Sequence, residues 1–305
     1  VLNELPDLQP RIQVSLFSIL EEKEIQIRGF KVRLPLDIQF IFTSNPEDYT
    51  NRGTIVTPLK DRVGSQILTH YPESVEVAKK ITKQESKINS VLGSKIHIPE
   101  VARDIIEQIS FEARESDLVD RKSGVSARMS ITSLQNLVSS AERRMIINNE
   151  EKTSIRMSDF SSVISSINGK VELVYEGEEE GAEQVSYNLI SSAVKSIFNK
   201  YFPRIEKLTK PDEISPYDSI LKWFSSKQLV INDNLKNKDY ENLLNQVEDA
   251  KKLIEKFIPE LNKDDKLFFI EFILWGLESY NKLSILRTNN GIEYKDPFNN
   301  FINKI

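Results

Sequence analysis

Hydrophobic periodicity changes at Pro99, and this change divides the expected fold into two parts. Ahead of Pro99, helical patterns alternate with strand-length apolar runs such as residues 38–43, which are rich in β-branched and aromatic side chains. After Pro99, helical patterns with almost no glycine or proline follow at 99–118, 129–148 and 157–167. The chain is therefore expected to contain an α/β part followed by an all-α part.

The α/β part carries signals for a helix, a hairpin and strands. Apolar residues recur every three or four positions across 7–22, as an amphipathic helix requires. Residues 24–34 alternate on both sides of an Arg-Gly-Phe-Lys turn and predict a β-hairpin. The run 38–43 predicts a buried strand. A short helix is expected to end near Gly64, and "ILTHYP" (67–72) predicts a further short strand.

The C-terminal half is expected to be mostly helical. Residues 171–175 predict a brief strand, and the acidic run that follows is typical of a solvated loop. A helix is predicted over 183–201, ahead of a linker rich in proline and charge. The apolar cluster 267–277 indicates the core stripe of a helical domain over 216–305.

Composition excludes several classes of protein. The 305 residues have a net charge of -5 and a pI near 5.4, which argues against direct nucleic-acid binding. The chain contains no cysteine, so disulfides and thiolate catalysis are excluded, and His70 and His97 lack the spacing of a metal-binding pair. Apolar runs are shorter than a membrane span and no signal peptide is visible. We therefore expect a cytoplasmic protein without membrane contact.

The order of the predicted elements is informative. A helix and a hairpin precede a strand that ends in Ser-Asn-Pro with Asn45; a short helix with Arg62 and a helical region with Arg128 follow. This order resembles the second half of an AAA+ ATPase. It is closest to the branch that contains MoxR-type ATPases and the magnesium chelatase I subunit. The resemblance covers about residues 1–168.

The resemblance implies the first two of four expected segments: the C-terminal half of an AAA+ α/β core with parallel strands and a hairpin (1–85) and a helical AAA+ lid (86–168). Local patterns predict the other two, a connecting segment (169–215) and a mostly helical C-terminal domain (216–305). The chain opens at Val1, at what would be the middle of the α/β core. We therefore expect it to be a fragment of a longer protein.

The first candidate site is the pair Asn3-Glu4. Phosphoanhydride hydrolysis needs a carboxylate that orients and deprotonates water. The family supplies it from an Asp-Glu pair ten and nine residues before a helical glutamine, and Gln13 places Asn3 and Glu4 at those positions. The resemblance thus implies Glu4 as the catalytic base, with Asn3 replacing the aspartate that supports Mg²⁺ through water; an amide brings no negative charge. Without the flanking match, the pair indicates a helix cap and a surface acid.

The remaining candidate residues contact ATP phosphates in the family. Asn45 resembles sensor 1, although Asn-Pro is also a turn signal. Arg62 corresponds to an arginine finger that reaches the γ-phosphate of a neighbouring subunit, although any surface arginine has the same sequence signature. Arg128 resembles the sensor 2 arginine at the start of a lid helix. Arg143 and Arg144 are expected on an exposed helix face, with Arg143 available for a subunit contact.

The hairpin places Arg28, Phe30, Lys31 and Arg33 at its tip. In relatives, such hairpins contact partners or line the ring pore. A hairpin that only protects a sheet edge fits the sequence equally well.

One essential part of an ATPase is missing from these residues. No G-x-x-x-x-G-K-[ST] loop occurs, and this loop supplies the backbone N–H groups and the lysine that hold ATP phosphates. The family places it upstream of Val1. The resemblance implies an ATPase using ATP and Mg²⁺, a homo-oligomeric ring taken as a hexamer, and a chaperone or remodelling role with a von Willebrand A domain partner.

Two alternatives remain at this stage. The chain also fits a scaffold that keeps the AAA+ shape but has lost nucleotide chemistry, which the replacement by Asn3 favours. A sigma-54-type transcription activator shares the "ELP…LQ" stretch, but its GAFTGA loop and helix-turn-helix are not found here.

Overall fold

The computed structural model describes residues 1–33, 37–45, 54–88, 93–205, 215–288 and 290–297. The chain divides into two compact units, an N-terminal unit (Val1–His70) and a C-terminal unit (Tyr71–Ile305). The division lies ahead of the 85/86 boundary expected from the sequence. Helix α3 (Val75–Glu85) explains the difference, because it buries Ala78 and Thr82 in the C-terminal unit, against α5 and α6.

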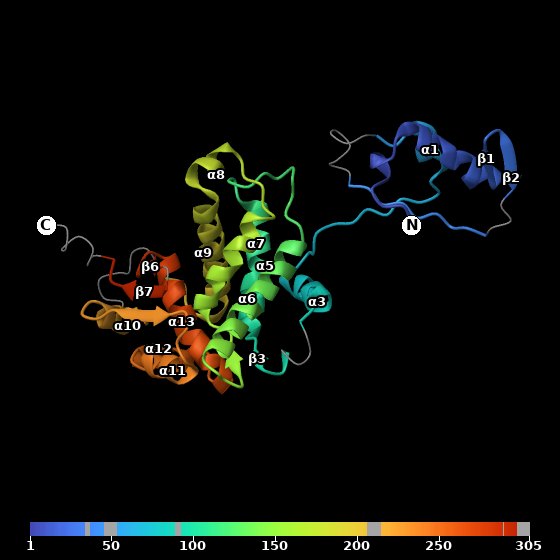
Figure 1. The fold of residues 1–305 in the computed structure, drawn as a ribbon. Helices are drawn as coiled ribbons and strands as arrows, with labels where there is room; N and C mark the ends of the chain where they lie inside the picture. The colour runs from blue at the N-terminus through green and yellow to red at the C-terminus, as the bar shows by residue number, and fades with distance from the viewer. Residues whose placement is uncertain (34–36, 46–53, 89–92, 206–214, 289, 298–305) are drawn as a thin grey trace. The chain divides into compact units, whose positions relative to one another are not determined.

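The described part of the N-terminal unit consists of short helical elements and a hairpin (Figure 1). Its elements are η1 (Leu5–Asp7), α1 (Pro10–Phe17), the π-helical turn η2 (Ser18–Glu22), β1 (Glu24–Ile27), β2 (Phe30–Arg33) and α2 (Thr57–Arg62). The predicted hairpin is confirmed, with Ile27 paired to Phe30 across the turn Arg28-Gly29. Both turn residues have positive φ, 48° and 87°, as a type I′ turn requires. Leu34, the last apolar residue of the pattern, lies outside the described residues.

Two predicted strands of this unit are wrong. The run 38–43 forms a single parallel bridge, Leu2 with Phe42, and Ile38 and Ile41 are 46% and 52% exposed. Residues 67–72 form no strand, and Ile67 is 89% exposed. A strand needs a paired neighbour along its length. Within the described part of this unit, the run 38–43 has a bridge partner only at Leu2, and no strand is paired with residues 67–70.

The C-terminal unit is a helical assembly with a small sheet at its C-terminal end (Figure 1). The helical patterns at 99–118, 129–148 and 157–167 are confirmed, as is the helix at 183–201. Its first elements are β3 (Ile96–His97), α5 (Glu100–Glu115), α6 (Arg128–Ile147), β4 (Thr153–Ser154), η4 (Met157–Val163), α7 (Ile164–Asn168), α8 (Tyr175–Glu180) and α9 (Ala182–Tyr201). There follow α10 (Asp218–Phe224), β5 (Leu229–Asn232), α11 (Asn237–Leu244), α12 (Glu248–Phe257), α13 (Lys263–Ser279), β6 (Ser284–Thr288) and β7 (Gly291–Lys295).

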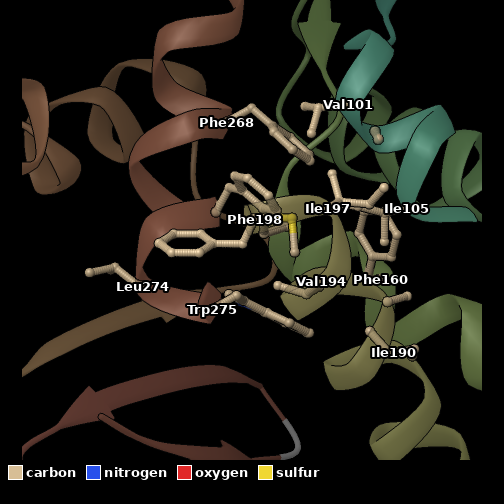
Figure 2. Close-up of a cluster of buried hydrophobic side chains, with 14 of the residues drawn as sticks. Val101, Ile105, Phe160, Ile190, Val194, Ile197, Phe198, Phe268, Leu274 and Trp275 are labelled. Carbon is tan, nitrogen blue, oxygen red and sulfur yellow. The ribbon is translucent and has the colours of Figure 1, made fainter. Parts of the chain in front are cut away.

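Helix α9 is the centre of this unit. Figure 2 shows its side chains Ile190, Val194, Ile197 and Phe198 among residues from α5 and α13. One hydrophobic core runs from Ile96 to Tyr294, so the helices expected as a lid and those expected as a separate C-terminal domain share it. Burial of this continuous apolar surface is the main force that holds these helices together.

Three further predictions for this unit need correction. The acidic run is the helix α8 and not a loop, because glutamate favours helices and acids in a first turn complement the helix dipole. The strand predicted at 171–175 is reduced to one bridge, Val119 with Leu173. The sequence interpretation also missed the antiparallel sheet β5-β7-β6, in which β7 lies between the other two strands. Much of the predicted linker, 206–214, lies outside the described residues.

Candidate functional site

Asn3 and Glu4 lie beside the segment that leads to Asn45. Leu2 pairs in parallel with Phe42: its N–H donates to Ile41 O at 2.8 Å, and its carbonyl accepts from Thr43 N at 3.0 Å. Leu5 continues the contact, since its N–H donates to Thr43 O at 2.9 Å. Residues 2–5 therefore lie beside residues 41–43, just before Asn45, and are hydrogen-bonded to them.

Thr43 connects the two candidate residues at this point. Its Oγ1 donates to Asn3 Oδ1 at 3.3 Å and accepts from the backbone N–H of Glu4 at 3.1 Å. Glu4 has φ 51° and ψ 58°, a left-handed conformation that is uncommon for a residue other than glycine. The sequence interpretation did not include Thr43, although a threonine two residues before Asn45 was visible. Asn45 itself is exposed.

Gln13 ties the helix α1 to the segment before α2. It is fully buried, although its helix otherwise exposes Ile12 and Val14. Its amide nitrogen donates to Leu8 O at 2.9 Å and to Thr54 O at 3.2 Å, while its oxygen accepts from Val56 N at 2.9 Å. The Gln13 side chain therefore satisfies three backbone groups.

Arg62 is engaged within its own unit. It ends α2, and its Nε lies 2.7 Å from Glu21 Oε1, while Nη2 donates to Glu21 Oε2 at 3.3 Å. Its Nη1 donates to Pro58 O at 2.8 Å, and the guanidinium lies 5.0 Å from the ring centre of Phe17. The side chain remains 30% exposed, at the wall of a cavity of about 550 Å³ that the segment 38–42 also lines.

Arg128 lies in the C-terminal unit and begins α6, the position that the sequence predicts for it. Its side chain is exposed, and its backbone N–H donates to Ser126 Oγ at 3.2 Å. The structure thus brings Asn3, Glu4 and Thr43 together, and describes Arg128 as part of a separate unit.

A buried ion pair in the C-terminal unit was missed by the sequence interpretation. Arg144 was expected on an exposed face but is only 2% exposed, because it pairs with Asp159 and donates to Ser154 O at 2.8 Å. Arg143 is exposed, as expected. Removing one partner of a buried ion pair destabilises the folded protein, because the other charge is left buried and unpaired. Arg144 and Asp159 therefore have a structural role.

Glu271 is the centre of a second buried polar network. Its carboxylate accepts hydrogen bonds from Tyr240 OH at 2.6 Å, Tyr294 OH at 2.9 Å and the backbone N–H of Met157 at 3.1 Å. Burial raises the pKa of Glu271, and the two tyrosine hydrogen bonds oppose that rise. Arg156 lies 4.0 Å from the ring centre of Tyr240, and burial lowers its pKa. These contacts join η4, α11, α13 and β7.

Within the described ranges, no group of three histidine, cysteine, aspartate or glutamate side chains is placed to hold a metal ion. The sequence expected only a water-mediated contact from Asn3, so this result leaves that expectation untested. Among the described helices, none is long and apolar enough to cross a membrane.

Comparison with protein-family models, with curated proteins and with solved structures found no match to this chain.

Proposed function

We propose that this chain is part of an AAA+ ATPase of the MoxR and magnesium chelatase branch. In a ring with other copies, hydrolysis of ATP would drive remodelling or chaperoning of a partner protein. The observation that carries the proposal is the junction of Asn3-Glu4 with Thr43 beside Asn45. A carboxylate and an amide follow directly after the parallel bridge of Leu2 with Phe42, and ligand-binding residues of α/β sheets lie at the corresponding place, beyond the carboxyl ends of parallel strands.

The conformation of Glu4 supports a role in the site. Left-handed φ at a residue with a side chain costs free energy, and such residues are concentrated at active sites. We assign to Glu4 the orientation and deprotonation of the attacking water, and to Asn45 contact with the γ-phosphate. Arg62 and Arg128 supply positive charge to the transition state, Arg62 toward a neighbouring copy.

The residues present fit ATP and Mg²⁺ in part. Asn3 Oδ1, Glu4 and Thr43 Oγ1 are oxygen donors suited to an ion that keeps several waters and takes its other ligands from phosphates. Bound ATP supplies the phosphoanhydride bond that is broken. The phosphate-binding loop is not among the 305 residues, so the proposal requires it in a segment ahead of Val1.

Steady-state ATP hydrolysis by the chain with its preceding segment tests the proposal. We expect a turnover number that rises with protein concentration, because Arg62 acts on the site of another copy. Restoring the acid, Asn3→Asp, is expected to lower the Mg²⁺ concentration needed for half-maximal rate. A preceding segment without the loop, or turnover absent at every protein and Mg²⁺ concentration, would overturn it.

The second candidate is an AAA+-shaped interaction scaffold without hydrolysis. The Glu21 contact of Arg62 favours it, since an arginine held in its own unit is not extended toward a neighbour. Asn3 favours it as well, because the amide brings no charge to a metal ion. Assembly without turnover is the result that this candidate predicts. A partner with a von Willebrand A domain belongs to both candidates.

A further inference from the structure

The C-terminal unit contains a cavity of about 870 Å³ that no part of the proposed hydrolysis uses. It lies between the short parallel pair β3–β4 and the helices α11, α12 and α13, all of which contribute lining residues. Its size falls within the range of about 300–1,000 Å³ typical of small-molecule sites. It is therefore large enough for an organic ligand.

The lining is positive although the chain is acidic overall. It includes five basic residues, Lys95, Lys152, Arg156, Lys251 and Lys266, against three acidic residues, Glu241, Glu255 and Asp264. The whole chain has a net charge of -5. A positive concave surface in an acidic protein concentrates anions.

The four lysines of this lining are available for an anion. Among the described residues, no ion pair joins Lys95, Lys152, Lys251 or Lys266 to a carboxylate, whereas Lys79 and Lys252 form such pairs elsewhere in the same unit. The nearby carboxylate of Asp265 is already in contact with His97, whose Nε2 lies 2.6 Å from its Oδ1. Within the described ranges, these four lysines, which come from three sides of the cavity, therefore form no ion pair with a carboxylate.

The wall of the cavity is held in place by hydrogen bonds. Arg156, 2% exposed, donates to Leu235 O at 2.9 Å and to Asn237 Oδ1 at 3.0 Å, and it stacks on the ring of Tyr240. The hydroxyl of Tyr240 is fixed by Glu271 at 2.6 Å. Apolar side chains complete the lining: Ile254 and Phe268 are each 1% exposed and form its base, and Leu267 is half-buried. A wall fixed in this way needs little reorganisation on binding.

We propose that this cavity binds a small organic phosphate, with the phosphate among the lysines and an apolar or aromatic body against the apolar part of the lining, where Leu267 is half-buried. Lysine binds phosphate as a compact point charge, so several lysines with no fixed geometry suit a dianion. The lining contains apolar as well as charged side chains, and apolar side chains do not bind inorganic phosphate. We therefore assign the site to a phosphate that carries an organic group. No residue that lines this cavity is one of those to which a role in ATP hydrolysis is assigned, so the two sites can be tested separately.

Calorimetric titration of the full chain with phenyl phosphate, phenol and inorganic phosphate tests the proposal. We expect saturable binding of phenyl phosphate at one site per chain, and at least about tenfold weaker binding of each of the other two probes, which lack one half of the recognised group. The affinity for phenyl phosphate is expected to fall as salt is raised from 50 to 200 mM. This change shortens the Debye length from about 14 to about 7 Å and screens the lysine charges.

Charge-neutralising variants locate the site. The double variant Lys152→Gln/Lys266→Gln is expected to weaken phenyl phosphate binding about tenfold, as the loss of two solvent-exposed charge contacts implies. The control Lys122→Gln/Lys238→Gln removes the same charge from exposed positions outside the cavity and is expected to leave affinity unchanged. Absence of saturable binding, equal losses in both double variants, or phenol binding as tightly as phenyl phosphate would each overturn the proposal.

Discussion

Arg62 and Glu21 form a two-point ion pair within the N-terminal unit, with Nε 2.7 Å from one carboxylate oxygen and Nη2 3.3 Å from the other. The pair joins the end of α2 to the turn that follows α1. Because the two side chains are 30% and 54% exposed, the pair contributes at most about 1 kcal/mol to stability. A contact this weak would allow Arg62 to exchange to a neighbouring copy, which the proposed arginine-finger role requires.

Substitutions at the two ends of this pair separate the catalytic and structural roles of Arg62. Arg62→Ala is expected to lower ATP turnover by about 10³-fold or more, the usual effect of losing an arginine finger, whereas Glu21→Gln retains turnover. Turnover of both variants is measured alongside their urea midpoints. An equal loss of turnover in the two variants would show that Arg62 acts only through Glu21.

Gln13 provides a test of how the N-terminal unit is held together. Gln13→Leu removes the acceptor for Val56 N–H and both donors, leaving three part-buried backbone groups without this partner at a cost of up to about 1–3 kcal/mol each. We expect faster amide hydrogen exchange at Val56 in this variant.

The variant Gln13→Glu is the matched control for that experiment. It keeps the acceptor for Val56 N–H but loses the donors to Leu8 and Thr54. Protection at Val56 is expected to survive in Gln13→Glu. Unchanged protection in Gln13→Leu would contradict the role assigned to the amide.

Close packing of α9 on α13 depends on Gly276. A Cβ at this position would clash with the ring of Phe198, a side chain surrounded by other rings. Gly276→Ala is expected to destabilise the chain by about 1–3 kcal/mol through overpacking, despite the better helix propensity of alanine. Gly93→Ala is the control, because a Cβ there meets no atom within 4 Å. Equal thermal stability of the two variants would contradict this packing.

Glu271 makes stability depend on pH. Burial raises the pKa of its carboxyl group in the folded chain, so the folded state holds the proton more tightly than the unfolded state. The contribution of this proton to the free energy of unfolding is fully present at pH values below the ordinary glutamate pKa. It is lost as pH rises from that value through the raised pKa of the folded chain.

The variant Glu271→Gln removes this titration while keeping an acceptor for the buried N–H of Met157. We expect the thermal midpoint of the wild type to fall relative to that of Glu271→Gln as pH increases through this window. Glu107 and Glu278, whose pKa values burial also raises, remain in both proteins and cancel in the comparison. Parallel melting curves across pH would contradict the role of Glu271.

Local signals in the sequence predicted the elements that depend on neighbouring residues. The hairpin at Gly29 follows from its turn chemistry, and the helices from 100 to 201 follow from apolar periodicity. The missed sheet had a signal of the same kind. The residues Asn-Asn-Gly before Ile292 separate two β-rich runs, but the long apolar run of α13 led us to extend the helical pattern across them.

Features that depend on distant residues could not be predicted. Nothing near Arg144 in the sequence indicates that Asp159 would draw it into the core, and nothing near Glu271 identifies Tyr240 or Tyr294 as donors. At the candidate site, the counting rule selected Asn3 and Glu4, but the hydroxyl that joins them, from Thr43, became visible only in the structure. The assignments of Asn45, Arg62 and Arg128 stay predictions.

The most direct test of the proposed function is ATP turnover by Glu4→Gln in the chain with its preceding segment, measured together with nucleotide retention. Asp7→Asn, which removes the same charge from an exposed residue three positions away, is the control. We predict that Glu4→Gln retains ATP but loses turnover by about 10²-fold or more, as removal of a general base implies, while Asp7→Asn matches the wild type. Turnover of Glu4→Gln equal to that of the wild type would contradict the assignment of Glu4 as the catalytic base.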